Sequence, residues 1–153
     1  MIKLRFLFVA VIGLSCLTGP AHAQSAWVKR CEGAQCEIVQ ILMDQQSNSR
    51  VMEAAIGFPS GKTEARLVLI LPLGVDLSQS FSLSIDDGVP LGFKVRYCLV
   101  DGCYAFLTLP PDVIAMMKNG SMAALSFRTY DGNPARLPLT LEGFSAAVTG
   151  IQK

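Results

Sequence analysis

Four cysteines in two pairs of identical spacing constrain the fold of this chain more than any other feature. Four residues, including a glycine, separate Cys31 from Cys36 and Cys98 from Cys103. The fifth cysteine, Cys16, lies in the N-terminal segment that is expected to be removed, which leaves four. An even number of cysteines in a small exported chain predicts two disulfides, and three pairings are possible. Chain entropy favours long bridges, because closing a longer loop restricts the unfolded chain more. A Cys31–Cys98 disulfide would stabilise the fold by about 4 kcal/mol, and a short one by about 2 kcal/mol. Hairpin geometry favours the short pairs, because it brings their Cα atoms within bridging distance, and we expect Cys31–Cys36 and Cys98–Cys103.

A thiolate metal site and a redox-active dithiol are the two other uses of these cysteines. Neither spacing is the C-x-x-C of thioredoxin-like catalysts, and an oxidising compartment disfavours a site of four free thiolates. Structural disulfides are therefore the preferred interpretation.

The N-terminus has the three-part pattern of a secretory signal peptide. Lys3 and Arg5 precede an apolar run over residues 6–17, and Ala21-His22-Ala23 supplies the small residues of a cleavage site. We expect residues 1–23 to be removed and residues 24–153 to form one domain. The apolar run is shorter than the ~20 residues that span a bilayer, and no later stretch is long and apolar enough. The expected product has no integral membrane segment and lies in the periplasm, at the cell surface or outside the cell.

Removal of the signal peptide also removes the only histidine, His22. Without histidine, a Ser-His-Asp triad, a Cys-His nucleophile and a His-ligated zinc are excluded. Loss of Lys3 and Arg5 brings the 13 Lys and Arg of the full chain to 11, against 12 Asp and Glu. This near-neutral balance gives no field for nucleic acid. We expect no catalytic residue, no cofactor and no metal ligand.

Short extended segments separated by turn signals fill the rest of the chain. Residues 67–71 are continuously apolar, which is typical of a strand buried on both faces, and Phe81, Leu83 and Ile85 alternate with polar residues. Pro138 lacks an N–H and indicates an edge strand. The expected strands cover residues 36–42, 50–58, 67–71, 81–86, 93–98, 104–109, 122–130 and 137–141.

One short helix is expected over residues 113–118, after Pro110-Pro111 and before Asn119-Gly120. A further helical turn fits residues 143–151. Many short strands joined by Gly and Pro turns predict an all-β sandwich.

Several residues are candidates for chemical sites. Asp86 and Asp87 are adjacent carboxylates, but successive strand residues face opposite ways, and Asp87-Gly88 is explained as a turn. Turn chemistry also explains Asp101-Gly102 and residues 131–134. Met116, Met117 and Met122 are soft copper ligands in principle, although methionine near a short helix is more often a core residue. Trp27 is expected in the core.

The ordered landmarks of the chain resemble those of the invasion-associated locus B (IalB) family of bacteria. The landmarks are Trp27, Cys31, Cys36, Gln40, Leu71-Pro72-Leu73-Gly74-Val75, Ile85-Asp86, the segment from Cys98 to Cys103, Lys118-Asn119-Gly120, Leu141-Glu142-Gly143-Phe144 and Ala146-Ala147. The resemblance covers essentially all of residues 24–153. It implies an exported envelope protein with an immunoglobulin-like β-sandwich and a contribution to host-cell interaction or envelope function. It carries over no enzymatic activity and no catalytic residue.

The leading functional hypothesis is a non-enzymatic envelope module that binds an unidentified protein or other envelope component. Loops and strand edges of sandwiches are common recognition surfaces, and we expect the contact in residues 76–84 or in the turn 131–134. The alternatives are a carboxylate- or metal-dependent periplasmic hydrolase and a redox or chaperone helper.

Overall fold

The computed structural model describes residues 26–152, and its strands lie in two antiparallel sheets. The first five strands are β1 (Val28–Glu32), β2 (Gln35–Met43), β3 (Arg50–Gly57), β4 (Ala65–Leu71) and β5 (Phe81–Ile85). The other strands are β6 (Leu91–Phe93), β7 (Val95–Leu99), β8 (Gly102–Leu109), β9 (Met122–Arg128) and β10 (Pro134–Thr140). The helices are α1 (Pro111–Asn119) and α2 (Phe144–Thr149).

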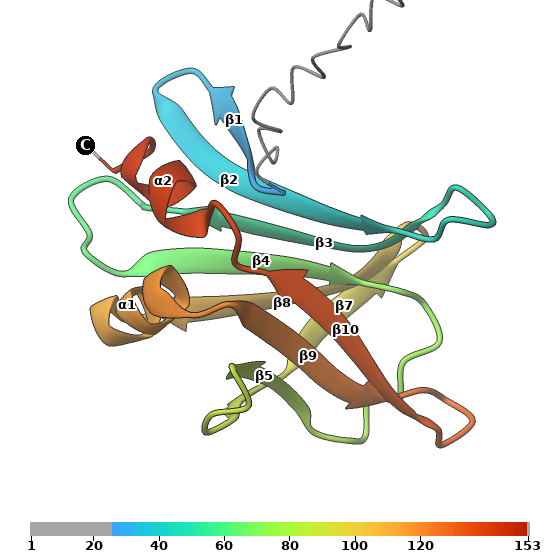
Figure 1. The fold of residues 1–153 in the computed structure, drawn as a ribbon. Helices are drawn as coiled ribbons and strands as arrows, with labels where there is room; N and C mark the ends of the chain where they lie inside the picture. Colours follow the sequence, from blue (N-terminus) through green and yellow to red (C-terminus); the bar gives the residue numbers. More distant parts are fainter. Residues whose placement is uncertain (1–25, 153) are drawn as a thin grey trace, which may run out of the picture.

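The two sheets form a β-sandwich, which confirms the predicted fold class (Figure 1). The strand order is β1-β2-β3-β4-β8-β7 in the six-stranded sheet and β10-β9-β5-β6 in the four-stranded sheet. β10 is an edge strand, as Pro138 predicts. Helices α1 and α2 contact each other at one end of the sandwich (Figure 1).

The core lies between the sheets and is supplied by alternate residues of each strand. On β4, Leu67, Leu69 and Leu71 are no more than 1% exposed and face the core. Val68 and Ile70 point to the opposite face and are only half-buried. The prediction that residues 67–71 are buried on both faces is therefore wrong, because no second layer covers the other face of this sheet within residues 26–152.

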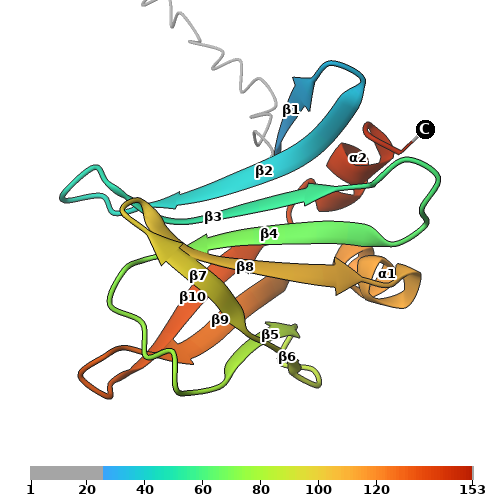
Figure 2. The same cartoon turned by 180° about the vertical axis from the view of Figure 1, so that it is seen from behind.

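The predicted strand over residues 93–98 is divided into two strands of different sheets. β6 pairs with β5 and β7 pairs with β8, with Lys94 between them (Figure 2). A bulge between Val95 and Tyr97 follows the crossing. The side-chain alternation continues through this corner, so the sequence pattern does not reveal that the strand changes sheet.

Both helices follow from short apolar patterns. α1 begins two residues before the predicted start, because Pro111 fits the first turn of a helix, and it buries Val113, Ile114 and Met117. α2 replaces the single turn expected near the C-terminus, so the structure has two short helices where one was predicted. Phe144 and Val148 lie four residues apart and are fully buried.

Trp27 lies in the core as predicted and helps to join the sheets. The residue is 4% exposed, its ring meets Phe144 edge-on at 5.2 Å, and its indole N–H donates to the carbonyl of Thr140 at 2.8 Å. The sandwich is thus closed at β10 by both an aromatic contact and a hydrogen bond.

Candidate interaction surface

One face of the six-stranded sheet packs on the core, and the other is left open among the described residues. Several large apolar side chains stand on this open face, with exposed fractions of 64% for Val28, 48% for Ile41, 44% for Tyr97 and 38% for Phe106. The cross-strand register places them on the same face of the sheet, since the row that begins at Val28 ends at Phe106 and the row that begins at Ile41 ends at Tyr97. We call this surface, which spans β1 to β7, the open face.

Three aromatic side chains form a cluster at the β7–β8 end of the open face. The ring centroids of Tyr97 and Tyr104 are 5.3 Å apart, and those of Tyr97 and Phe106 are 6.0 Å apart. The guanidinium of Arg96 lies 5.8 Å from the Phe106 centroid, within the range of a cation–π contact. Because rings held by neighbours lose little entropy on binding, such a cluster suits molecular recognition.

A chain of ion pairs crosses the open face diagonally from β1 to the β7–β8 turn. Arg30 contacts Glu37 at 2.8 Å and Glu53 at 3.1 Å. Arg50 contacts Glu53 at 3.0 Å and donates to the carbonyl of Asp101 at 2.7 Å. The Glu53 side chain is only 10% exposed, so the two arginines compensate its burial. The chain fixes polar groups in place between the apolar side chains.

Hydrogen bonding shifts the protonation of groups on this surface. The Tyr104 hydroxyl donates to the Asp101 carboxylate at 2.6 Å. This bond lowers the pKa of Asp101 from its ordinary value and raises the pKa of Tyr104. The hydrogen bond with Glu37 raises the pKa of Arg30. All three shifts favour the protonation states that hold the network together at neutral pH.

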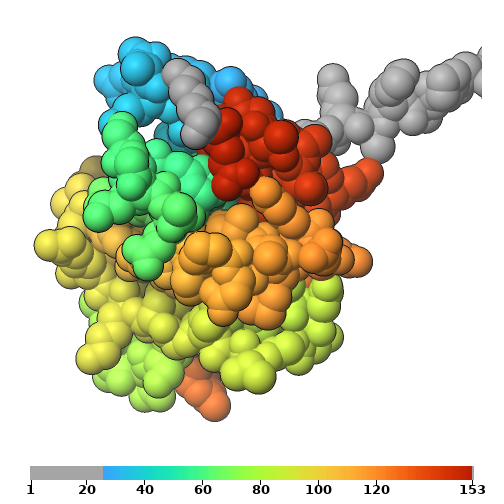
Figure 3. All heavy atoms as spheres, turned by 90° about the vertical axis from the view of Figure 1, so that its left-hand side faces the viewer, coloured from blue at the N-terminus to red at the C-terminus, as the bar shows by residue number. Residues whose placement is uncertain are grey.

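A groove of about 720 Å³ opens beside the β1–β2 hairpin. The hairpin tip and the loop between β3 and β4 stand on either side of it (Figure 3). Its lining combines the Arg30–Glu37 pair with Phe58, Val68 and Arg66. Gly57 leaves the sheet uncovered at this point, so the groove continues onto the open face.

The four cysteines pair as Cys31–Cys36 and Cys98–Cys103, which are the short pairings that hairpin geometry favours. Each disulfide joins directly opposite residues of a hairpin, with Cα–Cα distances of 4.0 and 3.9 Å. The two hairpins form the two edges of the six-stranded sheet. The disulfides therefore brace the margins of the open face.

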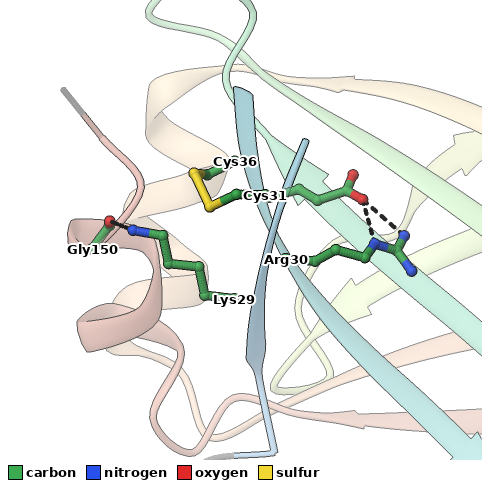
Figure 4. The surroundings of a disulfide bond; sticks show 6 residues. Lys29, Arg30, Cys31, Cys36 and Gly150 are labelled. Atoms are coloured by element: carbon green, nitrogen blue, oxygen red, sulfur yellow. Dashed lines mark hydrogen bonds and ion pairs between the residues drawn. A yellow bond between two sulfur atoms is a disulfide. The ribbon is translucent and has the colours of Figure 1, made fainter. Parts of the chain in front are cut away.

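Figure 4 shows that the side chains of β1 point to opposite sides of the strand. The disulfide and Lys29 lie on one side of the strand, where Lys29 donates to the carbonyl of Gly150 at 2.8 Å. Arg30 lies on the other side, toward the open face. The alternation of a strand thus supplies both an anchor to the C-terminal segment and a charged group of the surface.

The second hairpin depends on a close backbone approach at Gly102. Its φ is 148°, and a Cβ atom there would lie 2.7 Å from the Leu71 carbonyl oxygen. Glycine is therefore required where the β7–β8 turn meets β4.

The adjacent carboxylates Asp86 and Asp87 have separate structural partners. The Asp86 carboxylate accepts from the backbone N–H of Ser121 and of Met122, at 3.0 and 2.9 Å. Asp87 pairs with Arg136 at 2.5 Å. The structure does not bring the two carboxylates together on a shared partner, so they do not form the acid–base pair of a hydrolase.

The three methionines have different surroundings. Met117 is 1% exposed and fills the core, whereas Met116 and Met122 are 49% and 41% exposed. The core interpretation therefore holds only for Met117. Within residues 26–152, no three His, Cys, Asp or Glu side chains are grouped as a metal site would require.

The segments expected to make contacts have local roles. In residues 76–84, Phe81 and Leu83 enter the core, and Asp76 accepts from the Ser78 N–H at 3.0 Å, which closes a turn. In residues 131–134, Asp131 is held by Thr129 and by Asn133. The open face was missed, although the apolar outward positions Ile41 and Phe106 were available as a signal.

Comparisons with known proteins agree on one family. The family model described as "Invasion associated locus B (IalB) protein" matches residues 15–152. Two proteins of Brucella abortus, from strain 2308 and from biovar 1 strain 9-941, are named invasion protein B homologs. Each is 27% identical over 165 residues, covering 99% of this chain and 94% of its own length.

A solved structure has the same fold. The crystal structure of invasion associated protein B from Bartonella henselae superimposes with a TM-score of 0.76 and 20% sequence identity. The match covers 83% of this chain and 92% of the other. No helix among the described residues is long and apolar enough to cross a membrane.

Proposed function

Because the chain belongs to the invasion associated locus B (IalB) family, we propose that it is an exported, non-enzymatic interaction protein of the bacterial envelope. Residues 1–23 serve as its signal peptide, and residues 24–153 form the single mature domain. The name of the Brucella relatives, invasion protein B homolog, supports a contribution to host-cell interaction. The two disulfides support a compartment outside the cytosol.

The open face binds the partner, and the partner is a protein. One observation carries this assignment: Tyr97, Phe106 and Ile41 stand exposed on a rigid sheet, beside arginines fixed by ion pairs. Aromatic residues and arginine are enriched at the centres of protein interfaces. The ion pairs of Arg50 and Glu53 are formed before binding, so little entropy is lost in ordering them.

The absence of catalysis rests on chemistry that the chain lacks. Its only histidine, His22, lies in the signal segment, so no imidazole base is available in the mature chain. Asp86, Asp87 and Asp101 each hold a neighbouring backbone or side-chain group in place. Of the two carboxylates that line the groove, Glu37 is paired with Arg30, and Glu32 lies at the exposed end of β1.

Co-purification after crosslinking in the producing bacterium tests the proposal. The wild-type chain is compared with Phe106→Glu, which places a charge in the aromatic cluster. Tyr130→Glu is the matched control, because Tyr130 is 81% exposed and lies outside the open face. We expect the wild type and the control to recover the same protein and Phe106→Glu to lose it. Equal recovery by all three folded proteins would exclude the open face as the binding surface.

A further inference from the structure

The four edge strands of the sandwich differ in how well they resist pairing with another chain. β10 carries Pro134 and Pro138, which supply no N–H, and β6 has only three residues. β1 carries the charged side chains of Lys29 and Arg30. β7 has no proline and one charged residue, Arg96, which lies at the bulge near the start of the strand. β7 is therefore the least protected edge.

Apolar side chains are concentrated at the same edge. Tyr97 is 44% exposed, Leu99 is 55% exposed, and Val100 in the adjoining turn is 96% exposed. Tyr97 and Leu99 are two residues apart and so lie on the same side of the strand, on the open face. The turn lies at the end of β7 away from β6, where no described strand covers the edge (Figure 2).

The register of the hairpin determines which backbone groups face outward. Cys98 lies directly opposite Cys103 with a Cα–Cα distance of 3.9 Å, the short spacing of a non-hydrogen-bonded pair. In such a pair the N–H and C=O point away from the partner strand. The N–H and C=O of Cys98 therefore point outward from the edge, in the plane of the sheet, where an added strand would lie.

We infer that β7 is an interaction surface for a second copy of this chain. Two β7 strands pair antiparallel about a two-fold axis at Cys98, so that the Cys98 N–H of each copy donates to the Cys98 carbonyl of the other. Tyr97 then lies opposite Leu99 of the partner subunit, and Arg96 opposite Val100 of the partner subunit. No like charges face each other in this register, and the apolar side chains of the edge are removed from water.

The paired molecule has a continuous sheet of twelve strands. A two-fold axis perpendicular to the sheet keeps corresponding faces on the same side, so the open faces of both copies point in one direction. The aromatic clusters, which include Tyr97 and Phe106, adjoin across the axis. This inference does not depend on the proposed function, but it would make the binding surface bivalent.

Light scattering of the mature protein over a range of concentrations tests the pairing. We expect a species of twice the chain mass that dissociates on dilution. Leu99→Lys places a charge opposite Tyr97 and is expected to raise the dissociation constant roughly tenfold or more, about 1.4 kcal/mol. Val100→Lys is a second edge variant. Val89→Lys is the matched control, since Val89 is 88% exposed in the turn before β6.

A double variant tests the register itself. Tyr97→Glu combined with Leu99→Lys places opposite charges across the axis and is expected to restore pairing that Leu99→Lys alone has lost. Circular dichroism and a count of free thiols confirm that each variant is folded with both disulfides. A wild type that stays monomeric at every concentration overturns the inference. So does a dimer that survives Leu99→Lys and Val100→Lys, or one that Val89→Lys weakens equally.

Discussion

The side-chain amide of Gln40 forms two hydrogen bonds with the backbone of Thr140 and so joins the two sheets. Its Nε2 donates to the Thr140 carbonyl at 2.9 Å, and its Oε1 accepts from the Thr140 N–H at 3.0 Å. Gln40 is 7% exposed. One buried side chain therefore substitutes for the strand that would otherwise pair with this end of β10.

Replacement of Gln40 should destabilise the sandwich. Gln40→Leu leaves the Thr140 N–H buried without this acceptor, and we expect a loss of about 1–3 kcal/mol in the free energy of unfolding. Urea unfolding of Gln40→Leu and of the exposed control Gln45→Leu measures the difference. Thr140→Ala should cost less, because the contact uses only backbone atoms of Thr140. Equal stability of both glutamine variants would contradict this account.

Glu53 should matter more than other surface carboxylates. Glu53→Gln removes the charge shared by Arg30 and Arg50, and both arginines retain one further partner. We expect a loss of about 1–2 kcal/mol, less than for a fully buried pair because the arginines are partly exposed. The control is Glu32→Gln on exposed β1. If the two variants have the same urea midpoint, the ion-pair chain contributes nothing to stability.

The disulfides should act as structural braces. Cys31→Ala with Cys36→Ala, and separately Cys98→Ala with Cys103→Ala, should each lose about 2 kcal/mol through the short loop that they close. The second pair should lose more, since Cys103 is 2% exposed and its sulfur packs in the core. Thermal unfolding compares the two. A double variant of full stability that no longer captures its partner would instead indicate redox chemistry.

The hydrogen bond between Tyr104 and Asp101 predicts a pH dependence. The pKa of Tyr104 should lie above its ordinary 10.0 in the folded protein and fall in Asp101→Asn. The pKa of Asp101 is lowered in the folded state, so its contribution to stability is present above the unfolded value near 3.8 and is lost as the pH falls below it.

NMR titration of ring-labelled tyrosine follows Tyr104 directly, with Tyr130→Phe used to assign the remaining signals. If Asp101→Asn leaves the Tyr104 titration unchanged, the hydrogen bond does not form in solution.

Side-chain alternation was sufficient to predict most of the sandwich. It placed the strands that contain Leu69, Leu83 and Leu125, because one face of each enters the core and the pattern records that face. It missed β1, since Lys29 and Arg30 interrupt any apolar pattern and the strand is held by pairing to β2 alone. It also missed the crossing at Lys94, where the chain changes sheets without a change of period.

The open face was harder to predict than the fold. Outward apolar residues such as Val68 and Ile70 look like core residues when the sequence is read alone, so the sequence predicts that residues 67–71 are covered on both sides. The missing second layer is a property of the tertiary arrangement. Likewise, the contacts of Glu53 with Arg30 and Arg50 join different strands, and one sequence does not specify them.

Site-specific photocrosslinking in the living bacterium tests the central claim most directly. A photoreactive amino acid is placed at Ile41 on the open face or, as control, at Leu77, which is 58% exposed outside it. We predict that Ile41 yields one dominant adduct with another protein and that Leu77 does not. Adducts from Leu77 alone, or none from Ile41 with the folded and exported chain, would contradict the assignment of the open face as the binding surface.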